Sequence, residues 1–304
     1  MSKADPNRLP TPDEPYPDWS RFLKAVWMHG MSVKHIDPRL VGDHVDNACV
    51  SIKEAMTRRN EASTIRPSAF LACARQPFFA ATGEDRGEMP DNIGPTFSVG
   101  HLLHELSYAA VQSAMPTGFK VEVEKEVSLP DWWPDDYNRF NQHGHVDMFV
   151  TVEDACDVYA LGYLPEDAPS TMLVDFKTMG GFSYRKHGKT IFGEDPDAFG
   201  YLAQLSVYAD ALGVLDTGAI VAGINRDSLT QPLNPRFVSP QALQDEVARV
   251  KIAMEMALEG QDPGEEFLVR HGKEAYFQCG RGGKAGFCAF RDICKDRPPR
   301  DGAA

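Results

Sequence analysis

Two charged side chains stand at the end of an apolar run in the segment MLVDFKT, residues 172–178. Asp175 and Lys177 lie where the preceding apolar residues predict burial, although a buried charge lowers stability unless it is paired or binds a metal ion. Alternation along a strand places the two side chains on the same face. They could therefore serve metal-assisted chemistry, or form a surface ion pair that contributes under about 1 kcal/mol.

A second acid is expected to join this pair. Asp147 stands within HGHVDMFVTV, residues 143–152, which reads as a further strand. If the two strands are neighbours, the carboxylates of Asp147 and Asp175 meet, and a divalent cation that prefers oxygen would offset their repulsion. Lys177 could then position a water molecule and stabilise charge that builds on a phosphate oxygen. This is the chemistry of phosphodiester hydrolysis.

Four short patterns occur in order along the chain. They run from Gly100 to His104, from Gly144 to Asp147, from Asp175 to Lys177, and from Gln204 to Tyr208. In type and order they resemble the PD-(D/E)xK nuclease superfamily, and within it the RecB-family and CRISPR-associated iron-sulfur exonucleases. The resemblance extends over about residues 64–296.

The resemblance implies a restriction-endonuclease-like α/β core, in which helices flank a mixed central sheet. It also implies a metal-dependent exonuclease that hydrolyses phosphodiester bonds at DNA ends or in single strands, in recombination, repair or phage DNA processing. The groups that it implies as ligands of Mg²⁺ or Mn²⁺ are His104, Asp147, Asp175 and the backbone carbonyl of Phe176.

Further roles follow from the same resemblance. Lys177 would be the catalytic lysine beside the catalytic carboxylates. Gln204 and Tyr208 are four residues apart on one helical face, and Tyr201 lies three before Gln204, so all could contact a DNA phosphate or orient the lysine. Arg185 and Lys186 are candidate substrate-binding residues, although a solvated loop is the simpler interpretation of that stretch.

The histidine assignment has an alternative. His101 lies one turn before His104 and could be the ligand instead, but His104 matches the family spacing from Gly100. A satisfied core histidine is the other interpretation of His104. Glu105 is expected to be exposed and not a ligand.

Six cysteines are present, and three of them crowd the C-terminal segment, which suggests a metal or cluster site. The resemblance implies a [4Fe-4S] cluster, which would join the two ends of the core, and zinc bound by four thiolates is the main alternative. Cys49 and Cys156 are expected to be small buried residues. The implied cluster ligands are Cys73, Cys279, Cys288 and Cys294.

Composition limits the possible partners. The formal net charge of −13 argues against a broad basic surface that coats duplex DNA, but leaves room for a local groove. No apolar stretch approaches the roughly 20 residues of a membrane span, and the N-terminus lacks a signal pattern, so we expect a cytoplasmic protein without membrane contact. DNA is the expected partner, with a single-strand-annealing recombination protein as a possible companion by analogy.

The expected organisation is a mobile leader over residues 1–18, a helical extension over 19–63 and the nuclease domain over 64–304. Strands are predicted over 120–129, 143–152 and 171–178 in an antiparallel meander, with a buried strand at 218–225. Helices are predicted over 95–115, 197–213 and 239–260. In the first of these helices, the residues predicted to face the core are Val99, Leu102, Leu103, Leu106 and Ala110.

Two other functions remain open from the sequence. A nuclease-like module could bind DNA or a protein without cutting, for which the acidic balance is mild support. A zinc-stapled endonuclease is the other alternative.

Overall fold

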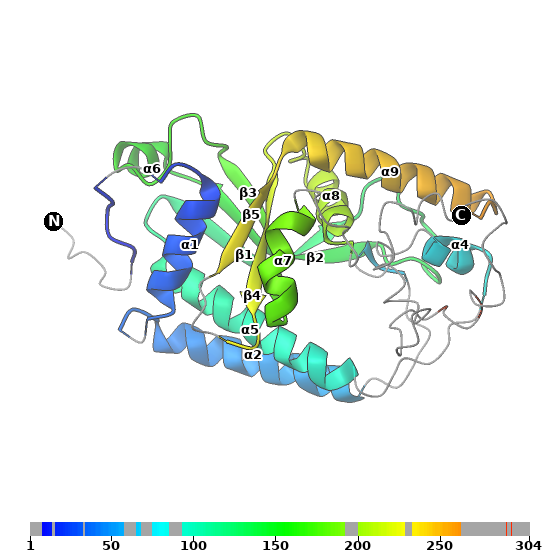
Figure 1. The fold of residues 1–304 in the computed structure, drawn as a ribbon, viewed down its shortest axis with the longest axis horizontal. Helices are drawn as coiled ribbons and strands as arrows, with labels where there is room; N and C mark the ends of the chain where they lie inside the picture. The colour runs from blue at the N-terminus through cyan, green and yellow to red at the C-terminus, as the bar shows by residue number, and fades with distance from the viewer. Residues whose placement is uncertain are drawn as a thin grey trace.

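A five-stranded sheet lies at the centre of the computed structural model, which describes residues 8–13, 16–32, 34–57, 65–67, 75–84, 93–191, 200–228, 233–262, 290 and 293 (Figure 1). The strands lie in the order β1-β2-β3-β4-β5. Their bounds are β1 Phe119–Ser128, β2 His143–Val152, β3 Thr171–Met179, β4 Ala219–Asn225 and β5 Asn234–Val238.

The sheet is mixed. β1, β2 and β3 pair antiparallel, which confirms the predicted meander, and β4 then pairs parallel to β3. β5 closes the edge antiparallel to β4. Helices cover both faces, so the chain has the mixed α/β architecture that its alternation of periodic segments predicts.

The helices are named in chain order. Their bounds are α1 Trp19–Gly30, α2 Pro38–Thr57, α4 Arg75–Ala81, α5 Ile93–Ala114, α6 Ala155–Ala160, α7 Gly181–Ile191, α8 Tyr201–Ala211 and α9 Pro240–Leu258. Side chains cap the starts of α1, α6 and α9. Asp18 accepts a hydrogen bond from the backbone N–H of Arg21 at 2.8 Å, Asp154 accepts one from Asp157 at 3.1 Å, and Ser239 accepts one from Ala242 at 3.3 Å.

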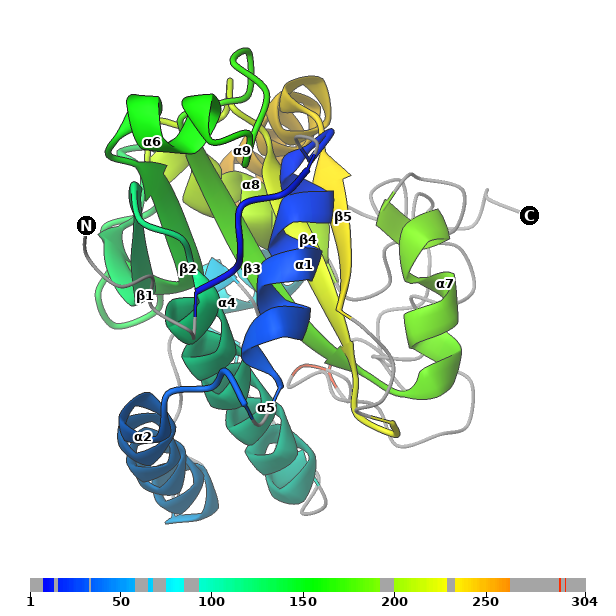
Figure 2. The ribbon, with the colours of Figure 1, turned by 90° about the vertical axis from the view of Figure 1, so that its left-hand side faces the viewer.

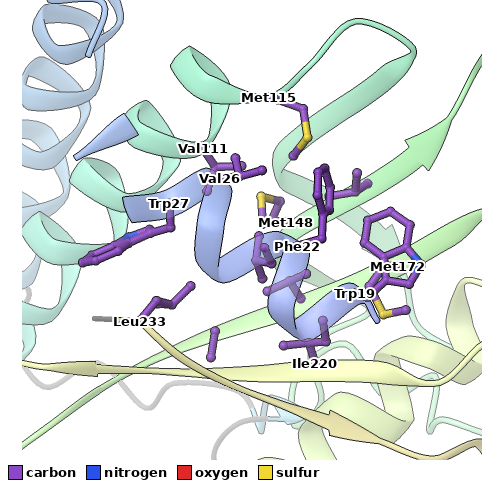
Figure 3. Close-up of a cluster of buried hydrophobic side chains, with 14 of the residues drawn as sticks. Trp19, Phe22, Val26, Trp27, Val111, Met115, Met148, Met172, Ile220 and Leu233 are labelled. Carbon is purple, nitrogen blue, oxygen red and sulfur yellow. The ribbon is translucent and has the colours of Figure 1, made fainter. Parts of the chain in front are cut away.

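One face of the sheet packs against α1 and α5, and we call it the α1 face. Figure 2 shows α1 crossing in front of the strands, with α8 and α9 behind them. Figure 3 shows the apolar side chains of α1 lying against those of the strands. The cluster joins α1, the C-terminal half of α5 and three strands, and its central members include Phe22, Val26, Val111, Met148, Met172 and Ile220.

The opposite face, which we call the α8 face, packs against α8 and α9. Its cluster includes Leu173 and Val221 from the strands together with Leu205 and Leu243 from the two helices. A third cluster lies beyond it, where α4 and the β1–β2 connection meet α8 and α9 around Phe79. The first four strands, β1 to β4, therefore contribute apolar side chains to both faces, which is typical of a covered sheet.

The N-terminal segment does not form the separate units that we predicted. Residues 8–13 of the expected mobile leader pack on the domain: Leu9 is 7% exposed, and its backbone N–H donates to the carbonyl of Ala114 at 2.7 Å. α1 lies in the main core, where Trp19 donates from its ring N–H to the carbonyl of Pro169 at 3.0 Å. The predicted boundary between residues 63 and 64 thus divides a single core.

Several local predictions were wrong for tertiary reasons. Val99 and Leu102, predicted to face inward on α5, are exposed, because the core lies against the following turns of that helix. Cys49 and Cys156, predicted to be buried, are exposed on α2 and α6. The predicted helical cap at Asp197 lies outside the described residues.

Candidate active site

The β2–β3 ladder ends where the two strand aspartates stand. Its last pair is Met148 with Val174, so Asp147 and Asp175 are the first residues beyond it. The backbone N–H of Phe176 donates to Oδ2 of Asp147 at 2.6 Å, in place of the ladder bond that the separated strands no longer make. Where the strands separate, side chains from both faces of the sheet can approach Asp147 and Asp175.

Lys177 binds the second aspartate and a glutamine of α8. Its ammonium donates to Oδ1 of Asp175 at 2.8 Å and to Oε1 of Gln204 at 3.1 Å, and it lies 5.4 Å from the centre of the Tyr201 ring. The predicted shared face of Asp175 and Lys177 is confirmed, as is the shared face of Gln204 and Tyr201 on α8. These contacts hold the lysine between β3 and α8.

Asp175 is a buried acid with one unused oxygen. It is 3% exposed, and its Oδ2 has no hydrogen-bond partner among the described residues. Burial raises the pKa of Asp175 to about 6, with Asp147 contributing and the Lys177 ammonium opposing. Burial likewise raises the pKa of Asp147, against Lys177 and the Phe176 N–H. Such a buried acidic pair is unfavourable on its own, which is typical of sites that receive a cation.

His104 approaches this pair from α5 on the α1 face. Its Nδ1 lies 3.8 Å from Oδ1 of Asp147, and its ring lies 6.2 Å from the ring of Phe176. Burial, with Lys177 nearby, lowers the pKa of His104 to about 3. The imidazole is therefore neutral at physiological pH, which is the form that binds metals. The alternative ligand, His101, is an exposed residue.

The neighbouring Glu105 is buried, which contradicts its predicted exposure. It is 8% exposed, and its Oε2 lies 2.5 Å from Nδ1 of His44 on α2. The second ring nitrogen of His44 lies 2.9 Å from Oε1 of Gln112, about two turns further along α5. α2 thus covers the side of α5 that we had predicted to face solvent, and this pairing fixes the rotation of α5 that turns His104 toward Asp147.

Tyr208 lies against a glycine of β2. A Cβ atom at Gly144 would lie 2.4 Å from Cε1 of Tyr208, so a larger residue cannot occupy this position without moving the ring. Tyr208 is 5% exposed and is also in side-chain contact with Gln204. Gly144 of the sequence pattern therefore has a steric role, because it lets α8 approach the strand that carries Asp147.

Sequence reasoning missed Glu124 and Tyr108. Glu124 has a φ of 47°, the only positive value among the described non-glycine residues, and it faces Asp147 where the β1–β2 register omits a pair. The Tyr108 hydroxyl donates to Oε1 of Glu124 at 2.7 Å and also contacts Asp147. Desolvation and the charge of Asp147 raise the pKa of Glu124 to about 7.

At the irregular pair of Glu124 and Asp147, the side chains of β1 and β2 switch from one face of the sheet to the other. Val123 packs on the α1 face and Val127 on the α8 face, although residues four apart share a face in a regular strand. On β2, Met148 likewise packs on the α1 face and Val146 on the α8 face, although the two residues flank Asp147 and would share a face in a regular strand. The strict alternation of the β1 sequence gives no signal of this change.

The aspartate oxygens and the imidazole nitrogen of His104 are atom types that bind Mg²⁺ or Mn²⁺. The 3.8 Å between Nδ1 of His104 and Oδ1 of Asp147 is less than twice a metal–ligand distance of roughly 2.1 Å, so one ion could contact both. Across the described part of the chain, however, no group of three or more His, Cys, Asp or Glu side chains is close enough to hold a metal ion as it stands. Asp175, with its unpartnered Oδ2, is the nearest source of a further ligand.

The remaining predicted site residues stand apart from this cluster. Arg185 and Lys186 lie on a helix, α7, where we had favoured a loop. All four predicted cluster ligands lie outside the described residues, namely Cys73, Cys279, Cys288 and Cys294.

Replacing Asp175 by asparagine should change how stability depends on pH. The raised pKa means that the folded chain holds this proton more tightly than the unfolded chain. The stabilisation of the folded chain that comes from binding this proton is complete below about pH 4 and is lost as the pH rises through about 6. Relative to the wild type, the free energy of unfolding of Asp175→Asn should therefore rise by on the order of 2 kcal/mol between acid and alkaline pH, measured by urea denaturation without divalent metal.

The control for this measurement is Asp216→Asn, because Asp216 is exposed after α8. Because the charge of Asp175 acts on the pKa of His104, and Asp147 acts on that of Asp175, the pH-dependent difference reports the titration of this group of residues together. A pH-independent difference between Asp175→Asn and the wild type would contradict the assignment.

Comparisons with known proteins add little to this geometry. No protein-family model matches the sequence, and no curated protein matches it. Similar solved structures include the crystal structure of SSO0001, which is 14% identical over 86% of this chain and 96% of that chain, with a TM-score of 0.44. None of the helices in the described part combines the length and apolar character that a bilayer crossing requires.

Proposed function

We propose that the chain is a metal-dependent deoxyribonuclease of the PD-(D/E)xK type, which hydrolyses phosphodiester bonds at DNA ends or in single strands. The observation that carries this proposal is the convergence of Asp147, Asp175 and Lys177 where β2 and β3 separate, with Oδ2 of Asp175 buried and unpartnered. A surface ion pair would not explain that burial, because a charged pair in solvent needs no such enclosure.

The order of elements also supports the restriction-endonuclease-like core. α5 carries His104, three antiparallel strands follow of which β2 carries Asp147 and β3 carries Asp175 and Lys177, and α8 then precedes the parallel strand β4. The groups that would hold Mg²⁺ or Mn²⁺ are His104, Asp147, Asp175 and the carbonyl of Phe176. When bound, the cation would polarise the phosphate and lower the pKa of water.

The protein side chains have their own tasks in this reaction. The Lys177 ammonium, fixed by Asp175 and Gln204, would hold the attacking water and stabilise charge on a phosphate oxygen. The two α8 residues, Gln204 and Tyr208, would keep the lysine and the phosphate in position. The neutral His104 would remain available as a ligand, because its lowered pKa prevents protonation at the pH of the reaction.

One observation favours a different function. The described residues contain no assembled group of three metal-binding side chains, which is compatible with a nuclease-like module that binds DNA or protein without cutting it. The net charge of −13 is mild support for the protein-binding form of such a module, since it disfavours a broad basic surface for duplex DNA. Cleavage itself therefore has to distinguish the two functions.

The cysteine site remains part of the proposal. Cys73 and the three C-terminal cysteines would hold a [4Fe-4S] cluster, with zinc as the alternative that gives a zinc-stapled endonuclease. The visible absorption of the purified protein separates the two, because iron–sulfur clusters are coloured and zinc thiolate sites are not. By analogy with recombination systems, a single-strand-annealing protein is the proposed companion.

The decisive experiment follows cleavage of end-labelled single-stranded DNA by the full chain with Mn²⁺, with Mg²⁺ and with chelator. We expect shortened products with either metal and none with chelator. Asp147→Asn should abolish the products, because it removes one anionic ligand and weakens the acceptor for the Phe176 N–H. Asp216→Asn, at an exposed site, is the matched control. Intact DNA under every condition would favour the binding module instead.

A further inference from the structure

α7 follows the catalytic strand directly. β3 ends at Met179 and α7 begins at Gly181, so Phe182 is five residues beyond Lys177, at most about 18 Å along an extended chain. Asp227 accepts a hydrogen bond from the backbone N–H of Gly181 at 2.6 Å, which fixes the start of the helix. The segment is therefore a structured extension of the strand that carries Lys177.

α7 packs on the same face of the sheet as the lysine. Gly223 pairs with Lys177 in the parallel β3–β4 register, and neighbours across such a pair face the same side. A Cβ atom at Gly223 would lie 3.0 Å from Cδ2 of His187, and Nε2 of His187 lies 3.0 Å from the carbonyl oxygen of Val221. The buried side of α7 thus covers the strand position beside Lys177.

The other side of α7 combines an aromatic ring with basic groups. Phe182, Arg185 and Lys186 occupy positions i, i+3 and i+4, which share one helical face, whereas Tyr184 and His187 are buried on the opposite side. Phe182 is 64% exposed, and the Lys186 ammonium lies 5.0 Å from the centre of its ring. No acidic residue occurs within α7, although the chain as a whole carries a net charge of −13.

We propose that this Phe182–Lys186 face of α7 is a base-stacking site for single-stranded DNA, separate from the catalytic cluster. The inference rests on the proposed function for its choice of ligand and goes beyond it by naming the side chains that recognise the strand. An exposed aromatic ring can receive any base, while adjacent cations meet the backbone phosphates. A duplex keeps its bases stacked inside and offers the ring no partner, so the site selects single strands.

The test is equilibrium binding of a labelled oligothymidylate of about 15 nucleotides to the full chain, by fluorescence anisotropy with chelator present to prevent cleavage. We expect Phe182→Ala to weaken binding by about tenfold, because one stacked base is lost. Phe182→Trp should restore it. Binding of an abasic strand of equal length should change less than about twofold in Phe182→Ala, since the phosphate contacts remain.

Two matched variants complete the design. Tyr137→Ala removes another exposed aromatic residue, which lies between β1 and β2, and should bind the oligothymidylate as the wild type does. Lys186→Gln should weaken binding of both the thymidylate and the abasic strand, and should reduce the dependence on salt. Unchanged binding by Phe182→Ala, or an equal loss with Tyr137→Ala, overturns the inference, as does a wild type that binds no single strand.

Cleavage separates this inference from the proposed function. If the wild type cuts DNA with Mn²⁺ while Phe182→Ala binds normally, the stacking site is wrong and the nuclease stands. If Phe182→Ala loses binding but the wild type never cuts, the stacking site stands and the nuclease is wrong.

Discussion

Lys177→Ala should cut single-stranded DNA about 10²- to 10³-fold more slowly than the wild type, because the ammonium that stabilises charge on the phosphate is gone. Gln204→Ala should also slow cleavage, since Gln204 accepts a hydrogen bond that helps to fix the lysine. The double variant should be no slower than Lys177→Ala alone, because a positioning residue has no effect without the group that it positions. Single-turnover cleavage rates of the four proteins measure this coupling.

Lys251→Ala is a well-matched control for this experiment. Lys251 also pairs with an acid, Asp210, at 3.2 Å, and lies 5.2 Å from the centre of the Trp132 ring, yet it stands on α9 away from the two strand aspartates. We expect it to cut at the wild-type rate. Additive losses in the Lys177 and Gln204 variants would show that the glutamine acts independently of the lysine.

Gly30→Ala should produce a large loss of stability. Gly30 ends α1 against α5, and a Cβ atom there would lie 1.9 Å from the carbonyl oxygen of Ala110, which is backbone and buried. No rotamer change can relieve that contact, so the two helices must separate. The free energy of unfolding should fall by about 3 kcal/mol, measured as a lower urea midpoint at constant slope.

Gly42→Ala tests the same exchange where space is available. Gly42 lies within α2, and no atom outside its own helix lies within 4 Å of the added Cβ. It should raise the free energy of unfolding by about 0.5–1 kcal/mol, because alanine restricts the unfolded chain and favours helix. Similar urea midpoints for the two variants would show that α1 and α5 do not pack this closely.

The sheet and most of the catalytic cluster could be predicted because their signals are local. Strict alternation identified β1, the apolar run at residues 172–174 identified β3, and the apolar segment 219–224 identified the buried strand β4. The site followed from residue types at fixed spacing, so Asp147, Asp175 and Lys177 are placed together as predicted. Their roles in catalysis stay predictions.

The parts that were missed depend on contacts between distant segments. Glu105 is buried because α2 contributes His44, a residue 61 positions away that no local pattern connects to it. Glu124 looks like one more alternating residue, yet its backbone leaves the regular strand conformation opposite Asp147. The segment of α7 was predicted to be a loop because it is rich in basic residues, and only a few of its side chains, such as Tyr184 and His187, are buried. Tertiary packing decides each of these cases.

The position of α1 has a consequence for how the chain folds. Its apolar side chains meet Met172 and Ile220, and Trp19 reaches Pro169, a separation of 150 residues. On a ribosome, the helix emerges long before the strands that will cover it. High contact order of this kind slows folding. The apolar face of α1 therefore stays exposed, and open to aggregation with other polypeptides, until β4 has been synthesised.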